Sequence, residues 1–247
     1  MLQYHKIISI VLGLLFLVVL QAFSNPLPIF RFLLPAFLGL LAITYFYNRN
    51  YLRSLGKENF WVLMRPSLLL TSGFLLFLVL PGPISRGFFF VATVAMIATF
   101  EILLANYSEN LMLNEAIITA FGFCFAFSRF AQDFPSFQYL YVLGVFGGLL
   151  LITRCFYEFI PHSNNAKWLN ALVVAFLSAQ IFWAASFLPF HFSVLAILMV
   201  NFFYAMLALN YYRLFNTLNL QKIKFHLALS GISLALVLSA TPWRIID

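Results

Sequence analysis

The chain has 247 residues, of which 64% are hydrophobic and only 9% are Asp, Glu, Lys or Arg. A soluble domain of this size is about one quarter charged, so the composition excludes an ordinary globular protein. The net charge is +7, but the basic residues stand singly, with no basic stripe and no RNA-binding motif, which argues against a nucleic-acid-binding protein.

Apolar runs of bilayer-spanning length recur along the chain, separated by polar or proline-bearing gaps. A transmembrane helix needs roughly 20 consecutive apolar residues, and its backbone groups must be satisfied within the segment. We therefore predict nine helices, over 7–23, 29–47, 60–80, 87–106, 112–131, 137–159, 168–187, 191–212 and 225–241. The predicted fold is all-α, a polytopic integral membrane helix bundle of four hairpins plus one terminal helix in a single transmembrane domain, 1–247.

The gaps between the predicted helices are of two kinds, and they alternate. Short proline turns follow the odd helices, and polar loops follow the even ones: "NRNYLRSLGKEN", "YSENLMLNE", "PHSNNAK" and "RLFNTLNLQKIK". Eight basic residues lie at the N-terminus or in the polar loops: Lys6, Arg49, Arg53, Lys57, Lys167, Arg213, Lys222 and Lys224. Four lie beside the proline turns: Arg31, Arg86, Arg129 and Arg244. The positive-inside rule then predicts a multi-pass protein of the cell membrane, with the N-terminus inside, the C-terminus outside and anionic lipids at the cytoplasmic face.

Two features of this pattern have alternative explanations. Residues 1–24 are also compatible with a cleaved signal peptide. The turn prolines are spaced by 53, 54, 54 and 53 residues: Pro28, Pro81, Pro135, Pro189 and Pro242. This period is compatible with duplicated helical hairpins, but two bilayer-length helices with two links also require about 54 residues. Trp61 and Trp168 have the same periodic spacing as these prolines. They are predicted to be aromatic anchors at the inner interface.

One acidic residue, Glu101 in "ATFEILLANYSEN", falls inside an otherwise apolar run. A lone ionised carboxylate at this depth is costly and normally acquires a partner or a proton. Counting along antiparallel helices places Arg65 at the same level, and Arg154 at the equivalent position two helices later. We predict a buried ion pair that fixes helix register, a ligand site, or simple snorkelling of the charged side chain towards the inner surface. In the ligand site Glu101 takes a proton or cation, and Arg65 or Arg154 holds an anionic headgroup.

Other polar residues predict weaker features. Arg154 and Glu158 are spaced i, i+4, as are Arg129 and Asp133, and we predict pairs at the membrane interface worth a few tenths of a kcal/mol. His226 matches the predicted depth of Arg65. It is expected either to join an inner polar layer or simply to be hydrogen-bonded.

Small residues predict places of close helix approach. Gly144 and Gly148 form a GxxxG pair, and a second ridge is made of Gly231, Ala235 and Ser239. Either ridge can contact a neighbouring helix of this chain, another membrane subunit or a second copy. Cys124 and Cys155 fall in apolar runs without metal-ligand spacing and are predicted to be buried hydrophobes, and we expect no metal and no cofactor.

The pattern leaves three classes of function open. No nucleophile, zinc-protease or phosphate-binding motif is present in the sequence, so we do not expect catalytic residues. We favour a non-catalytic structural or accessory subunit of a membrane assembly. The alternatives are a transporter or lipid-handling protein that uses the polar layer around Glu101, and a lipid-modifying membrane enzyme with scattered single residues.

Overall fold

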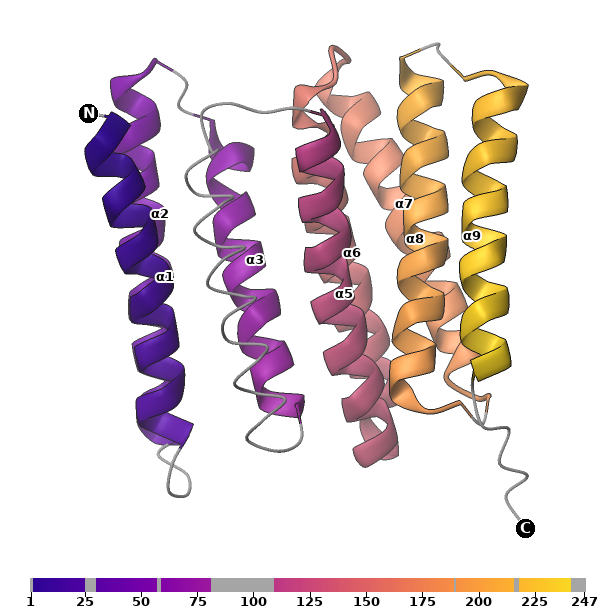
Figure 1. Ribbon diagram of the computed structural model, residues 1–247, viewed down its shortest axis with the longest axis horizontal. Helices are drawn as coiled ribbons and strands as arrows, with labels where there is room; N and C mark the ends of the chain where they lie inside the picture. Colours follow the sequence, from indigo (N-terminus) through magenta and orange to yellow (C-terminus); the bar gives the residue numbers. More distant parts are fainter. Residues whose placement is uncertain are drawn as a thin grey trace. The chain divides into compact units, whose positions relative to one another are not determined.

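The computed structural model describes residues 2–24, 30–56, 59–80, 109–188, 190–215 and 218–240. Regular structure in these ranges is entirely helical, with eight α-helices and two single-turn 3-10 helices (Figure 1). The α-helices are α1 (Leu2–Ser24), α2 (Phe30–Ser54), α3 (Phe60–Val79), α5 (Glu109–Asp133), α6 (Gln138–Phe156), α7 (Asn164–Ala185), α8 (Phe192–Leu214) and α9 (Leu220–Ala240). The 3-10 helices are η1 (Pro135–Phe137) and η2 (Tyr157–Phe159). The all-α prediction is confirmed for this part of the chain.

Six of the described helical segments are long and apolar enough to cross a membrane. They are Phe60–Val79, Leu111–Asp133, Pro135–Phe159, Asn164–Ala185, Phe192–Leu214 and Leu220–Ser239. Helices α1 and α2 cover the first two predicted spans, whereas the predicted helix 87–106 lies outside the described residues. The chain is therefore a multi-pass helical membrane protein. The total of nine crossings stays a prediction, as do the turns at Pro28, Pro81, Pro189 and Pro242, which are also outside the described ranges.

Local signals set several helix ends. The Asn59 side chain accepts a hydrogen bond from the Trp61 amide at 2.9 Å and so caps α3, and Ser163 caps α7 through the Ala166 amide. Gly56, in the turn after α2, has a φ of 65°, which a residue without Cβ adopts readily. Pro135 opens η1, where its missing amide hydrogen would have no helical acceptor. These residues account for the helix ends observed there, including the start of α7 at Asn164, four residues before the predicted start at 168.

The chain divides into two compact units, Met1–Glu115 (unit 1) and Ala116–Asp247 (unit 2). In unit 1, α2 packs against both α1 and α3. The Phe37 ring stacks on that of Phe74 with centroids 4.1 Å apart, and the Phe16 ring lies 6.4 Å from Phe37. Three successive helices thus share one aromatic core.

Unit 2 is built from consecutive antiparallel neighbours. Helix α7 packs against α6 and α8, and α8 packs against α9 (Figure 1). Buried small residues Ala171, Ala175 and Ala179 on α7 allow close packing, while Phe182 and Phe203 fill the space between helices. Helix α9 is the least enclosed of the six candidate spans, because most of its side chains are exposed.

Candidate functional site

The sequence predicted a site made of Glu101, Arg65 and Arg154, and the structure describes two of these residues. Glu101 lies outside the described residues, so its proposed pairing stays a prediction. Arg65 is in the second turn of α3 and Arg154 is in the last turn of α6. Both side chains are almost fully buried, at 6% and 2% exposure. Each belongs to a polar cluster within its own unit.

In unit 1 the buried Arg65 forms an ion pair with Glu115. The Nη2 atom of Arg65 donates a hydrogen bond to Oε2 of Glu115, and the carboxylate side chain is only 7% exposed. A buried charge is tolerated when it is paired and hydrogen-bonded. The pair joins α3 to the beginning of α5, two helices separated by a long stretch of chain.

Sequence reasoning gave Glu115 no role, although the predicted helix 112–131 includes it. The residue also ends the polar stretch "YSENLMLNE", and α5 begins earlier than predicted, at Glu109, which places Glu115 in its second turn. Acidic residues are favourable near a helix N-terminus, so a Glu-containing start can be helical. A signal was present in the spacing, because Glu115 lies 20 residues before Pro135, as Trp61 lies 20 before Pro81.

Unit 1 also buries uncharged polar side chains on α1, α2 and α3. Ser9 on α1, Thr44 and Asn48 on α2, and Ser72 on α3 are each at most 2% exposed. Thr44 and Asn48 are spaced i, i+4, which places them on one face of α2. The Thr44 hydroxyl has no hydrogen-bond partner among the described residues. Unit 1 thus encloses a polar interior besides its ion pair.

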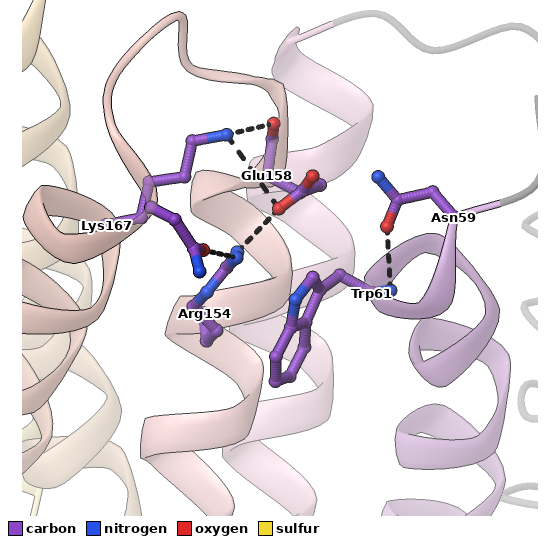
Figure 2. Close-up of polar contacts among 6 residues, drawn as sticks. Asn59, Trp61, Arg154, Glu158 and Lys167 are labelled. Carbon is purple, nitrogen blue, oxygen red and sulfur yellow. Dashed lines mark hydrogen bonds and ion pairs between the residues drawn. The ribbon is translucent and has the colours of Figure 1, made fainter.

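In unit 2 the side chain of Arg154 is the centre of a second cluster, and Figure 2 shows this side chain directed toward Glu158. Its Nη1 donates to Glu158 Oε2 and its Nη2 to Asn164 Oδ1, each at 2.6 Å. The guanidinium also lies 5.6 Å from the centroid of the Trp168 ring. Lys167 Nζ donates to the backbone carbonyl of Glu158 at 2.8 Å and lies 3.8 Å from its Oε2. This Arg154 cluster (Arg154, Glu158, Asn164, Lys167 and Trp168) joins the end of α6 to the start of α7.

The predicted nature of the Arg154–Glu158 pair was wrong, although the pair itself forms. The i, i+4 spacing suggested a solvated pair at the interface, yet Glu158 is 17% exposed and Arg154 almost fully enclosed. The first turns of α7 supply the enclosing groups, Asn164 and Trp168. By contrast, Arg129 and Asp133 form the expected half-exposed pair at 2.8 Å, each 39% exposed.

Three hydrogen bonds attach α8 to its neighbours in unit 2. Asn210 donates to the Tyr157 hydroxyl at 2.9 Å, and Asn201 donates to Ser233 Oγ on α9 at 2.6 Å. His226 Nδ1 lies 2.7 Å from the Tyr204 hydroxyl, which confirms the prediction that this histidine is hydrogen-bonded. Interhelical hydrogen bonds of this kind help to fix how membrane helices meet.

The two small-residue ridges have different surroundings. A Cβ placed on Gly144 would come within 2.5 Å of the Phe127 ring, and one on Gly148 within 2.7 Å of Phe123. This GxxxG pair therefore meets phenylalanines of α5 in the same chain. Gly231, Ala235 and Ser239 on α9 are exposed.

The cysteines behave as predicted, because Cys124 and Cys155 are both buried free thiols. Within the described residues, no group of three or more His, Cys, Asp or Glu side chains is placed to hold a metal ion. Comparison of the chain with protein-family models, curated proteins and solved structures finds no match.

Proposed function

We propose that the protein is a non-catalytic structural or accessory subunit of a membrane assembly, in which buried charged residues hold the helices in register. One observation carries this proposal. Each buried charged side chain in the described part of the chain, Arg65, Glu115 and Arg154, has an oppositely charged partner within its own unit. Charges matched in this way are typical of helix attachment.

The alternative of a transporter or lipid-handling protein is favoured by a different observation, the polar interior of unit 1. Ser9, Thr44, Asn48 and Ser72 are buried on α1, α2 and α3. Intramembrane polar residues often mark the path of a substrate or ion. In this reading, Glu115 would exchange its bond to Arg65 for a proton or cation during each cycle.

Reconstitution into liposomes separates these proposals. The wild-type protein is inserted into vesicles that contain a pH-sensitive dye, and proton or monovalent-cation flux is measured under an imposed gradient. The subunit proposal expects flux no faster than in protein-free vesicles. Flux that is fast in the wild type and abolished in a stably folded Glu115→Gln variant would establish transport and refute our proposal.

A stability measurement gives the matched control. Exchanging the two charges in Arg65→Glu/Glu115→Arg keeps an ion pair between α3 and α5 while moving the carboxylate to the other helix. If the pair is only a helix attachment, the exchanged variant should melt closer to the wild type than either single variant does. An exchanged variant no more stable than the single ones would contradict a purely attaching role.

The accessory role itself requires a partner. After extraction in a mild detergent, the protein should migrate in a complex with one defined membrane protein at constant stoichiometry. Migration as a single chain under conditions that preserve other membrane complexes would contradict the role.

The proposed topology is tested separately by placing cysteine at Arg53 or Lys167, where an impermeant thiol reagent added outside intact cells should not react.

A further inference from the structure

The side of α9 that faces α8 is polar, whereas its other sides are apolar and exposed. Figure 1 shows α9 beside α8, the described helix against which it packs. Among the described side chains of α9, the two that are buried are His226 and Ser230, at 6% and 7% exposure. Ser233 continues the same face, because positions 226, 230 and 233 are spaced i, i+4, i+7. Ile232 and Leu236, by contrast, are exposed. Attachment of α9 to α8 therefore depends strongly on polar contacts.

His226 is the residue of this face whose charge can change near neutral pH. Histidine gains its proton between about pH 8 and 5, whereas the hydroxyls of Ser230 and Ser233 stay neutral. The Nδ1 atom of His226 lies 2.7 Å from the Tyr204 hydroxyl on α8, and its ring centroid lies 5.3 Å from that of Tyr212. A neutral imidazole satisfies this arrangement, because one of its ring nitrogens accepts a hydrogen bond and the other donates one.

A proton on His226 would place a charge in this buried position without a counter-charge. Residues 159–246 contain no Asp and no Glu, so neither α8 nor α9 supplies a carboxylate. Burial of an unpaired charge is costly, and the cost is avoided when the charged group becomes accessible to water or headgroups. Contact between α8 and α9 should therefore weaken when His226 is protonated.

The titratable and charged groups that face His226 also oppose a proton there. Tyr204 and Tyr212 of α8 are neutral at this pH. Lys222, one turn earlier on α9, is positively charged, and like charges spaced i, i+4 repel each other. The Lys222 Nζ atom lies 4.4 Å from the centroid of the Tyr212 ring, so this ring already contacts a cation. The first turn of α9 contains no acidic residue that would offset these charges.

We propose that His226 is a pH-sensitive switch that holds α9 against α8 when neutral and releases α9 from α8 within the membrane when protonated. His226 lies in the second turn of α9, about 9 Å along the axis from the start of the helix, so a proton has a short path from the water at that end. Attachment is strongest at neutral pH and above, and it weakens as the pH falls toward 5. Because one proton is bound, the ratio of attached to released α9 should fall by at most about tenfold per pH unit. This switch goes beyond the proposed function and applies equally to a subunit and to a transporter.

The test measures the distance between spin labels on α8 and α9 in the full-length protein, reconstituted into nanodiscs of neutral phosphatidylcholine. The labels are attached to Ile197→Cys in the second turn of α8 and Leu236→Cys near the end of α9. The native Cys124 and Cys155 are buried. One short distance is expected at pH 8, and a second, longer population is expected at pH 5. An unchanged distance distribution between these pH values would overturn the proposal.

Two histidine variants identify the group that responds to pH. His226→Gln takes up no proton in this range, so the short distance should persist at pH 5. The matched control is His162→Gln, which removes an exposed histidine between η2 and α7 and should respond like the wild type. A pH response that persists in His226→Gln, or that is lost equally in His162→Gln, would refute the assignment to His226.

Two lysine variants keep the proposal falsifiable if His226→Gln folds poorly. Lys222→Gln removes the neighbouring positive charge, so the midpoint of release should move to lower pH by about 0.2–0.4 of a unit. The matched control is Lys224→Gln, which removes the same charge from an exposed position that is not spaced i, i+4 from His226 and should move the midpoint less. Equal shifts in both variants, or an unchanged midpoint in Lys222→Gln, would contradict the proposed electrostatic origin.

Discussion

In unit 1 the buried ion pair joins residues 50 positions apart, Arg65 on α3 and Glu115 on α5, whereas in unit 2 Arg154 and Glu158 lie four positions apart. The first pair connects α3 and α5, which are far apart in the sequence. The second closes a turn between α6 and α7, which are consecutive and pack against each other along their length. Removing a charge should therefore have different structural consequences in the two units.

The partners around the two pairs differ as well. Arg154 has a neutral acceptor in Asn164 besides its carboxylate, and Glu158 is shared with Lys167. Without Glu158, Arg154 keeps its hydrogen bond to Asn164, and its side chain is already in the favourable last turn of α6. A local pair with a spare acceptor tolerates change better than a long-range pair that is buried on both sides.

The largest expected effect is the contrast between Glu115→Ala and Glu158→Ala. Removal of the Glu115 carboxylate leaves a buried guanidinium without this counter-charge, at a loss of about 3–5 kcal/mol in the free energy of unfolding. Glu158→Ala should cost only about 1–2 kcal/mol, because Asn164 still accepts from Arg154. Unfolding in mixed detergent and SDS micelles measures both values. Equal losses would remove the distinction between the two pairs.

A second contrast concerns glycine packing, with an expected effect of about 1–3 kcal/mol. Gly148 in unit 2 approaches the Phe123 ring so closely that an added methyl group forces that ring to move. Gly39 in unit 1 has no atom within 4 Å of an added Cβ. Gly148→Ala should therefore lower the melting temperature, whereas Gly39→Ala should leave it unchanged or raise it through helix propensity. A destabilising Gly39→Ala would show that unit 1 also depends on close approach there.

A third comparison replaces whole pairs by apolar side chains, with an expected difference of about 1 kcal/mol. Arg65→Met/Glu115→Leu should recover most of the stability lost in the single variants, since no charge stays behind. Arg154→Met/Glu158→Leu should recover less, because Asn164 loses its donor and Lys167 its carboxylate. The same unfolding assay applies. Full recovery of stability in Arg154→Met/Glu158→Leu would mean that the contacts of Asn164 and Lys167 contribute nothing to the free energy of unfolding.

The smallest expected effect belongs to Asp133→Ala. Arg129 and Asp133 have the same i, i+4 spacing as Arg154 and Glu158 but are each 39% exposed. An exposed pair of this kind contributes about 0.2–0.5 kcal/mol. The melting temperature should change by about 1 °C at most, as expected for so small a loss in a chain of this size. If Asp133→Ala were as costly as Glu158→Ala, burial would not explain the strength of the pair between Arg154 and Glu158.

The helices were largely predictable from the sequence, because length and apolarity alone select segments that can cross a bilayer. The burial of Arg65 followed from its position inside an apolar run. Its partnership with Glu115 did not, since a helix start containing Asn and Glu has the composition of a loop. Pairing between distant segments depends on which helices become neighbours, and periodicity in a single sequence does not specify that.

For the local pair of Arg154 and Glu158, the contact could be predicted but its burial could not. Its spacing identified the contact correctly, but the depth of that contact depends on Asn164 and Trp168 of the following helix. Similarly, GxxxG indicated a close approach at Gly144 and Gly148 without naming Phe123 and Phe127 as the groups approached. A sequence pattern identifies which side chains of one helix are available for contact. The packing of the helices decides which residues they contact.

The hydrogen bonds between α8 and α9 bear on how this part of the chain assembles during synthesis. Helix α8 is synthesised before α9. Asn201 and Tyr204 on α8 can therefore be in the bilayer before Ser233 and His226 on α9 arrive to bond with them. Hydrocarbon gives no preference for one sliding position over another, since lipid and leucine are equally apolar. A slip of one helical turn moves each side chain by about 5.4 Å, beyond hydrogen-bonding reach. The two hydrogen bonds thus select one axial register of α9 against α8.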